Sequence, residues 1–208
     1  MDWYQDHQYH EHPLHIGSHA IIRSHTTIYG GSTVGEYLQT GHYADIREHS
    51  QLGDHVSVGK NYTDIQGYVQ IGSYVCFHSN DRIEQHSIVD DYVWIFPGMK
   101  LTNDPTPSSE ELMSVHVHSY AIICANVTIL PGREAKSDCL VGADAVVAKD
   151  VEPHTVVMGV SARVVGDVRD IRNKVTGEPV YPWHEHFDRA MPWEGFGYKA
   201  WVTGLKRS

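Results

Sequence analysis

The residues best suited to chemistry in this sequence are histidines and carboxylates near the tripeptide Thr102-Asn103-Asp104. His86 precedes Asp104 by 18 residues, and Asn103 stands beside that carboxylate. A carboxylate next to an imidazole fixes the tautomer of the ring and raises its basicity, so such a pair can take a proton from a nucleophile. The amide of Asn103 can hydrogen-bond a substrate. His86, Asn103 and Asp104 are therefore candidate catalytic residues, provided that the fold brings them together.

A six-residue repeat supplies the elements that would do so. An aliphatic residue recurs every six positions, with one extra residue within 59–64 and an interruption at 102–116. The series consists of Ile16, Ile22, Ile28, Val34, Thr40, Ile46, Leu52, Val58, Ile65, Ile71, Phe77, Ile83, Val89, Ile95, Leu101, Val117, Ile123, Ile129, Ala135, Val141 and Val147. Small or β-branched residues stand two positions before most of these, as alternating inward positions of short strands require. A six-residue period does not match an α-helix, and a β-sandwich would not keep one phase over eight hexads. The repeat predicts an all-β chain, a parallel β-helix of about seven coils with three hexads in each coil.

The register of such a helix decides which side chains meet. With 18 residues in a coil, Leu101 stacks on Ile83, and Asp104 then falls near His86. This register is the basis for choosing His86 as the general base and Asp104 as the residue that orients it. Three other histidines remain alternative bases: His78, His116 and His118.

Two kinds of residue depart from the repeat. Glycine often follows the aliphatic position, as at Gly17, Gly35, Gly41, Gly53, Gly59, Gly72 and Gly142, and we expect corners there with unusual backbone φ. Asp81 and Arg133 carry charge at inward positions. Because a buried unpaired charge is too costly to keep, each must turn outward, form a pair or serve a site.

The ends of the chain lie outside the repeat. Residues 1–15 carry several histidines, and we expect them to cap the first coil rather than to bind a metal ion. The β-helix spans 16–166, with an external loop at 102–116. Residues 167–208 are rich in aromatic side chains, and we expect a short helix within 184–191. These aromatics should fold back over the last coil or onto a neighbouring subunit, since an open β-helix end exposes strand edges.

Composition excludes several classes of function. The net charge is -10, and lysines and arginines form no cluster, which argues against nucleic acid as a partner. Three scattered cysteines favour a reducing compartment. The sequence has neither a signal peptide at its start nor an apolar run long enough to span a membrane. We therefore expect a cytoplasmic protein without a membrane partner.

Four segments within 41–166 resemble the hexapeptide-repeat acyltransferase superfamily. They are GHYADIREHSQLGDHVSVG (41–59), IFPGMKLTNDPTPSS (95–109), ICANVTILPG (123–132) and VGADAVVAKDVEPHTVVMGVSARVVG (141–166). The resemblance implies a left-handed β-helix, assembly as a homotrimer and transfer of an acetyl group from acetyl-CoA. The Thr-Asn-Asp tripeptide is most similar to N-acetyltransferases of nucleotide-linked amino sugars, which implies such a sugar as the acceptor.

The resemblance also implies where coenzyme A binds. The backbone at Ala125 and Ala143 would contact the pantetheine arm, and Lys149 and Arg163 would contact the phosphates. Cys124 replaces a usual glycine, and Val160-Ser161 replaces a usual Asn-Pro, so the fit of coenzyme A is in question.

Three alternative functions stay open at this stage. The first is O-acetylation of a sugar or of serine. The second is a γ-type carbonic anhydrase, whose zinc-binding histidines are not reproduced in phase; His116 and His118 stand too close together to replace them. The third is a non-catalytic trimeric assembly protein, for which the departures at Cys124 and Val160-Ser161 leave room.

Overall fold

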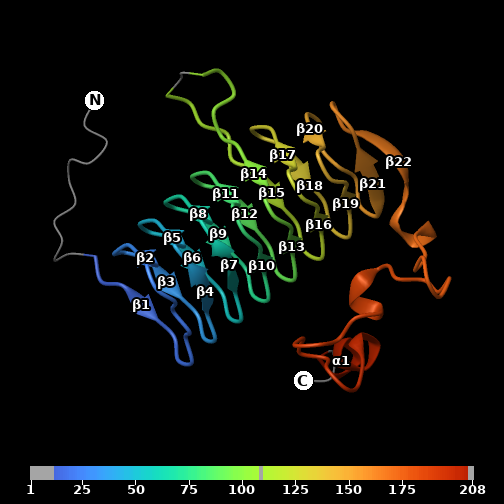
Figure 1. The fold of residues 1–208 in the computed structure, drawn as a ribbon, viewed down its shortest axis with the longest axis horizontal. Helices are drawn as coiled ribbons and strands as arrows, with labels where there is room; N and C mark the ends of the chain where they lie inside the picture. The colour runs from blue at the N-terminus through green and yellow to red at the C-terminus, as the bar shows by residue number, and fades with distance from the viewer. Residues whose placement is uncertain (1–11, 108–109, 206–208) are drawn as a thin grey trace.

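A computed structural model gives the fold, and it describes residues 12–107 and 110–205. The described chain is a prism of short stacked strands, which form three sheets whose strands run parallel except for β22 (Figure 1). Sheet A, in order, contains β1 (His15–Ile16), β3 (Thr33–Val34), β6 (Gln51–Leu52), β9 (Gln70–Ile71), β12 (Ile88–Val89), β15 (His116–Val117) and β18 (Glu134–Ala135). Sheet B contains β4 (Gln39–His42), β7 (Ser57–Asn61), β10 (Cys76–Phe77), β13 (Trp94–Ile95), β16 (Ile122–Ile123), β19 (Leu140–Val141), β21 (Thr155–Met158) and β22 (Arg163–Asp167). Sheet C contains β2 (Thr27–Ile28), β5 (Asp45–Ile46), β8 (Asp64–Ile65), β11 (Arg82–Ile83), β14 (Lys100–Leu101), β17 (Thr128–Ile129) and β20 (Val146–Val147).

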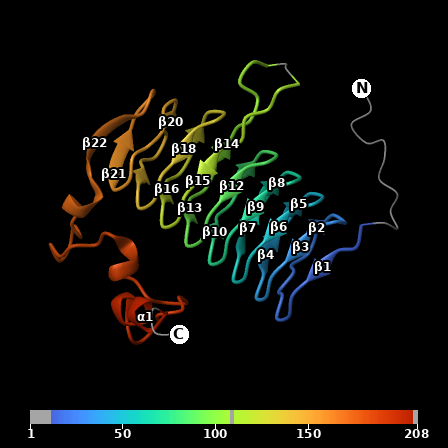
Figure 2. The same ribbon diagram turned by 180° about the vertical axis from the view of Figure 1, so that it is seen from behind.

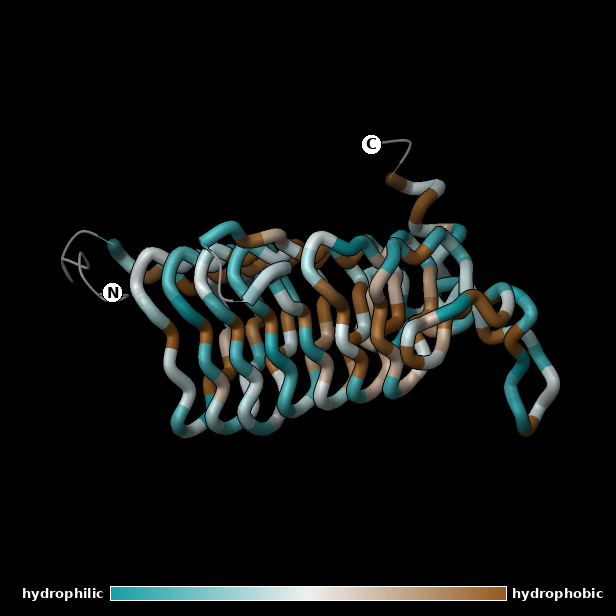
Figure 3. The backbone as a smooth tube through the Cα atoms, turned by 90° about the horizontal axis from the view of Figure 1, so that it is seen from above, coloured by the Kyte–Doolittle hydropathy of each residue, from teal (hydrophilic) through white to brown (hydrophobic). Residues whose placement is uncertain are grey.

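The parallel β-helix predicted from the repeat is confirmed. Strands of successive coils pair in the predicted register, with Leu101 against Ile83 and Ile83 against Ile65. The aliphatic series is buried from Val34 onward, and hydrophobic segments recur at the same place in successive coils (Figure 3). In the first coil, Ile16 is 37% exposed, because only one neighbouring coil packs on it. Burial of this continuous apolar column is the main driving force for the fold.

The turns at the corners of the prism depend on residues with left-handed backbone, and not on the glycines that the sequence indicated. The left-handed residue comes three positions after most aliphatic residues, as at Tyr37 (φ 59°) and His55 (φ 56°). Their rings stack with centroids 4.5 Å apart, which favours a conformation that non-glycine residues seldom adopt. Gly35 has no positive φ, so that expectation was wrong. It is needed because a Cβ there would lie 2.7 Å from the backbone carbon of Gly53 in the next coil.

The external loop projects from the corner between sheets C and A (Figure 1). It runs from 102 to 115, between β14 and β15, so His116 of the predicted 102–116 loop is already the first residue of β15. At its neck the Met113 N–H donates to the Asn103 carbonyl at 2.8 Å. The Gly132 N–H of the next coil donates to the Met113 carbonyl at 3.2 Å. These bonds fix both ends of the loop to the prism.

The C-terminal extension lies beside the coils rather than over the last one, seen from both sides in Figures 1 and 2. It contains two short 3₁₀ helices (Val168–Asp170 and Trp183–Glu185) and α1 (Tyr198–Leu205). The short 3₁₀ helix Trp183–Glu185 overlaps the start of the predicted 184–191 segment, whereas the α-helix α1 follows that segment. Residues 1–11 of the expected N-terminal cap lie outside the described residues.

The aromatic side chains of the extension contact the middle coils, so the expectation that they cover the last coil was wrong. The indole N–H of Trp183 donates to the Tyr120 carbonyl at 2.9 Å, and Trp183 meets Trp94 edge-on. Trp193 is fully buried in this cluster. The end of sheet B is closed instead by β22, which pairs antiparallel with β21. None of the helices in the described residues has the length and apolar character that crossing a membrane requires.

The two charged residues at inward positions behave differently. Arg133 is partly exposed, and its guanidinium lies 3.7 Å from the Asp150 carboxylate, so it has turned outward and paired. Asp81 stays inside the prism, 1% exposed, and accepts a hydrogen bond from the Met99 N–H at 3.0 Å. Burial raises the pKa of Asp81 to about 7.

Candidate active site

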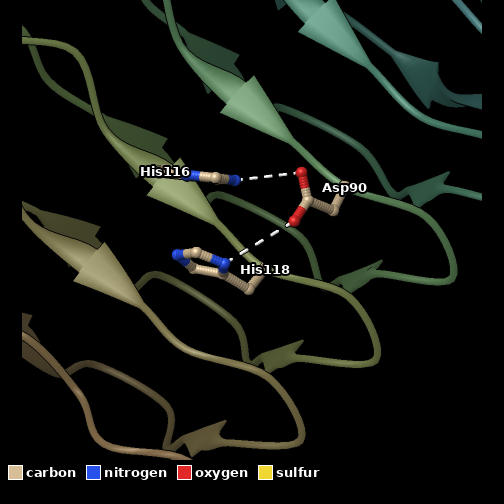
Figure 4. A group of neighbouring side chains, drawn as sticks. All are labelled: Asp90, His116 and His118. Atoms are coloured by element: carbon tan, nitrogen blue, oxygen red, sulfur yellow. Dashed lines mark hydrogen bonds and ion pairs between the residues drawn. The ribbon is translucent and has the colours of Figure 1, made fainter.

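Four polar side chains gather on the outer face of sheet A, at the root of the external loop. His116 Nε2 lies 2.9 Å from Asp90 Oδ1, and His118 Nδ1 lies 3.6 Å from Asp90 Oδ2 (Figure 4). His118 Nε2 lies 3.1 Å from Glu134 Oε2. The two imidazoles stack with their centroids 3.8 Å apart. We call these four residues the sheet A cluster.

The register of three neighbouring coils positions this cluster. Ile88 pairs with His116 and His116 with Glu134, while Val89 pairs with Val117. Asp90 and His118 directly follow this second pair, so they occupy equivalent places one coil apart. Outward side chains at such places stand about 4.8 Å apart. The contacts of the cluster therefore follow from strand pairing.

Sequence reasoning named His116 and His118 only as alternative bases and missed Asp90 and Glu134. A signal was present, because Asp90 follows Val89 just as His118 follows Val117. The loop hides it, since the step from Ile88 to His116 is 28 residues instead of 18.

The residues predicted to be catalytic lie at the same edge of the prism, but they make other contacts. His86 is exposed at the corner between sheets C and A. The centroid of its ring lies 5.5 Å from the centroid of the Tyr68 ring. The Asp104 carboxylate accepts the Thr106 N–H at 2.9 Å, and Asn103 closes the neck of the loop through its carbonyl. The described contacts thus include no pairing of His86 with Asp104, and their catalytic roles stay predictions.

A groove of about 680 Å³ runs along sheet A and reaches the cluster. Its walls include Gln51, Gln70, Asp90, Asp91 and Ser119. None of its lining residues, all within the described part of the chain, is lysine or arginine. A groove of this size and polarity can hold a small polar molecule against Asp90, the residue that His116 contacts.

The residues predicted to contact coenzyme A lie elsewhere on the prism. Ala125 and Ala143 stand on adjacent coils at the corner between sheets B and C, where the Asp144 N–H donates to the Ala125 carbonyl at 2.9 Å. Arg163 is exposed in β22, and the exposed Lys149 follows β20 at the other edge of sheet C. Within one chain, sheet C separates the corner that carries Ala125 and Ala143 from the cluster.

No protein-family model matches the sequence, and no curated protein matches it. Solved structures do match. The polySia-specific acetyltransferase NeuO has a TM-score of 0.54 and 12% identity over 93% of this chain and 94% of that one. The polysialic acid O-acetyltransferase OatWY has a TM-score of 0.52 and 14% identity over 74% of this chain and 84% of that one.

A third match is the UDP-N-acetylglucosamine acyltransferase from Campylobacter jejuni. Its TM-score is 0.51 with 11% identity, over 73% of this chain and 69% of that one. The chain spans less than half of the serine acetyltransferases it matches, 42–43% of their length. At these identities the comparisons establish the fold: this chain has the stacked β-helix found in sugar acetyltransferases and acyltransferases.

Proposed function

We propose that this chain is an acetyltransferase that moves an acetyl group from acetyl-CoA to a hydroxyl or amino group of a sugar-like acceptor. The observation that carries the proposal is the pairing of His116 with Asp90 at the end of the sheet A groove, 2.9 Å apart. An imidazole held by a carboxylate beside a ligand-sized groove is the arrangement that general-base catalysis needs.

The chemistry is a direct attack on the thioester. His116 removes the proton of the acceptor group while the oxygen or nitrogen of that group bonds to the thioester carbonyl carbon. The carbon–sulfur bond then breaks, and coenzyme A leaves as a thiolate that takes the proton from His116. Asp90 holds the ring through Nε2, which leaves Nδ1 to take the proton, and it stabilises the imidazolium that forms. A positioned base of this kind contributes roughly 10²- to 10⁴-fold in rate.

The predicted coenzyme A contacts lie apart from the sheet A cluster, and this separation supports assembly as a homotrimer. The corner with Ala125 and Ala143 and the outer face of sheet A belong to different sides of one prism. A second copy that packs this corner against sheet A would place coenzyme A beside His116. Lys149 and Arg163 would then offer positive charge to the phosphates.

The chemistry of the groove bears on the acceptor. The resemblance favours the amino group of a nucleotide-linked sugar, and O-acetylation of a sugar or of serine is the alternative. Asp90 and Asp91 line the groove, and its described lining lacks a cationic side chain. Such a lining favours a neutral sugar in the groove, because the phosphates of a nucleotide would need cations from elsewhere.

The test is an acetyl-transfer assay over a panel of neutral sugars, amino sugars, nucleotide-linked sugars and serine. Released thiol is measured together with the mass of the acetylated product. We expect activity with at least one sugar, and a kcat at least 10²-fold lower in His116→Ala. His86→Ala is the matched variant, because it tests the base chosen from the sequence. A larger loss in His86→Ala than in His116→Ala would overturn the assignment, and inactivity with all acceptors would overturn the function.

A further inference from the structure

The sheet A cluster also has the composition of a metal site. His116 Nε2, His118 Nδ1 and an Asp90 oxygen all lie within 4.8 Å of one another. A tetrahedral zinc ion with bonds of about 2.0–2.1 Å holds its ligand atoms roughly 3.3 Å apart, so small side-chain rotations suffice. Two imidazoles and a carboxylate are ligands that divalent transition metal ions prefer.

The contact between His118 and Glu134 points the same way. Glu134 lies 3.1 Å from His118 Nε2, and a neutral ring that donates to this carboxylate carries its proton on that nitrogen. The lone pair of Nδ1 then faces the Asp90 carboxylate at 3.6 Å. A lone pair against a carboxylate oxygen is unfavourable, and either a second ring proton or a metal ion between the two atoms removes the repulsion. Metal-binding histidines are commonly held in this way, by a carboxylate on the nitrogen away from the ion.

The position of the cluster suits an exchangeable ion. The His116, His118 and Asp90 side chains are 30%, 27% and 35% exposed, so an ion can reach them from solvent. Three protein ligands leave a fourth position for water.

We propose that Asp90, His116 and His118 bind one Zn²⁺ ion, or a similar divalent transition metal ion, and that Glu134 holds His118 in the binding orientation. A bound ion would take the lone pair of His116 Nε2 and leave the proton on Nδ1. The ring could then no longer accept a proton, so zinc would inhibit acetyl transfer. This inhibition rests on the proposed function, whereas the binding of zinc does not.

The binding test is a zinc titration of the chelator-treated full-length chain, in competition with a chromophoric chelator. We expect one equivalent with micromolar or tighter affinity, lost in His118→Ala and in His118→Gln. Glu134→Gln should weaken binding about 10- to 100-fold. His15→Ala is the control for the histidines near the start of the chain, and it should still bind one equivalent of zinc. Thermal melts establish that each variant is folded.

The outcome against the proposal is equally definite. Absence of a micromolar site in the wild-type chain, or an equivalent that survives in both His118 variants, would overturn the metal site. Inhibition is read separately, from acetylated product by mass spectrometry, because free thiol binds zinc. Full activity at saturating zinc would overturn the claim of inhibition alone. If the chain is inactive with all acceptors, the zinc titration still tests the metal site.

Discussion

Replacing Asp81 by asparagine should change how the stability of the fold depends on pH. Asp81 is the acid inside the prism, where burial raises its pKa to about 7 although the backbone N–H of Met99 donates to it. In Asp81→Asn the amide oxygen can keep the bond to Met99, while the ionisable group is removed. Thr63 occupies the equivalent place one coil earlier and is also buried, so a neutral polar side chain fits there.

The magnitude follows from the two pKa values of the group. Asp81 loses its proton near pH 3.8 in the unfolded chain and near pH 7 in the folded chain. Between these values the folded chain holds a proton that the unfolded chain has lost, so stability falls as pH rises. A full pH unit inside this window costs about 1.4 kcal/mol, and because Asp81 is half-ionised at pH 7 in the folded chain, the two units from pH 5 to pH 7 cost roughly 2.3 kcal/mol. For a chain of this length, that corresponds to a Tm lower by about 5–10 °C.

The assay is thermal unfolding followed by circular dichroism at pH 5, 6, 7 and 8. We expect the Tm of Asp81→Asn to exceed that of the wild type by several degrees at pH 8, with a much smaller difference at pH 5. Some pH dependence should remain in the variant, because burial also raises the pKa of Asp138 to about 6. Glu178→Gln removes an exposed carboxylate and should leave the pH dependence unchanged. If the Tm of Asp81→Asn falls with rising pH as steeply as that of the wild type, the assignment of this pH dependence to Asp81 is refuted.

Three further predictions test the site, the coil spacing and the extension. Asp90→Asn should lower kcat by roughly 10²- to 10⁴-fold with little change in KM, because the ring of the base loses its orienting carboxylate; an unchanged kcat would speak against this role. Gly53→Ala should destabilise the fold by about 1–3 kcal/mol in a urea titration, because the new methyl group would lie 2.8 Å from the backbone of Gly72. Gly166→Ala is the control and should not destabilise the fold, since the space around Gly166 is open. Trp193→Ala should cost about 3–5 kcal/mol within the extension and make it sensitive to protease, and resistance equal to the wild type would contradict its role in docking.

The repeat predicted the architecture because each hexad repeats the same local rule. An aliphatic residue every six positions fixes which side chains face inward, and burial of a continuous column then fixes the register. The corners were harder to predict, since many residue types can adopt the left-handed region at a modest cost. Tyr37 and His55 do so three positions after Val34 and Leu52, where stacking of their rings favours it. The glycine that directly follows an aliphatic residue, such as Gly35, allows close backbone contact between coils. Its residue type had suggested an unusual φ instead.

The extension shows a different limit of the sequence. Its tryptophans predict that the segment is buried, but hydrophobic burial has no direction and does not name the surface that covers them. The answer lies in outward-facing residues of sheet B, where Trp94, Ile122 and Leu140 stand at the position that the polar Gln39 and Ser57 occupy in the first coils. Three apolar residues at one outward position of successive coils could have indicated this surface before the structure was known.

The external loop explains why the sequence offered His116 only as an alternative base and did not bring it together with Asp90. Up to Ile88 the chain advances close to 18 residues per coil, and the step to His116 is 28, so the loop adds ten residues without disturbing sheet A. The neck bond between Met113 and Asn103 returns the chain to the corner that it left. Because His116 re-enters through strand pairing with Ile88, its approach to Asp90 is set by the sheet and not by the conformation of the loop. The loop can therefore vary in shape, and select among acceptors, while the pair that would take the proton stays in place.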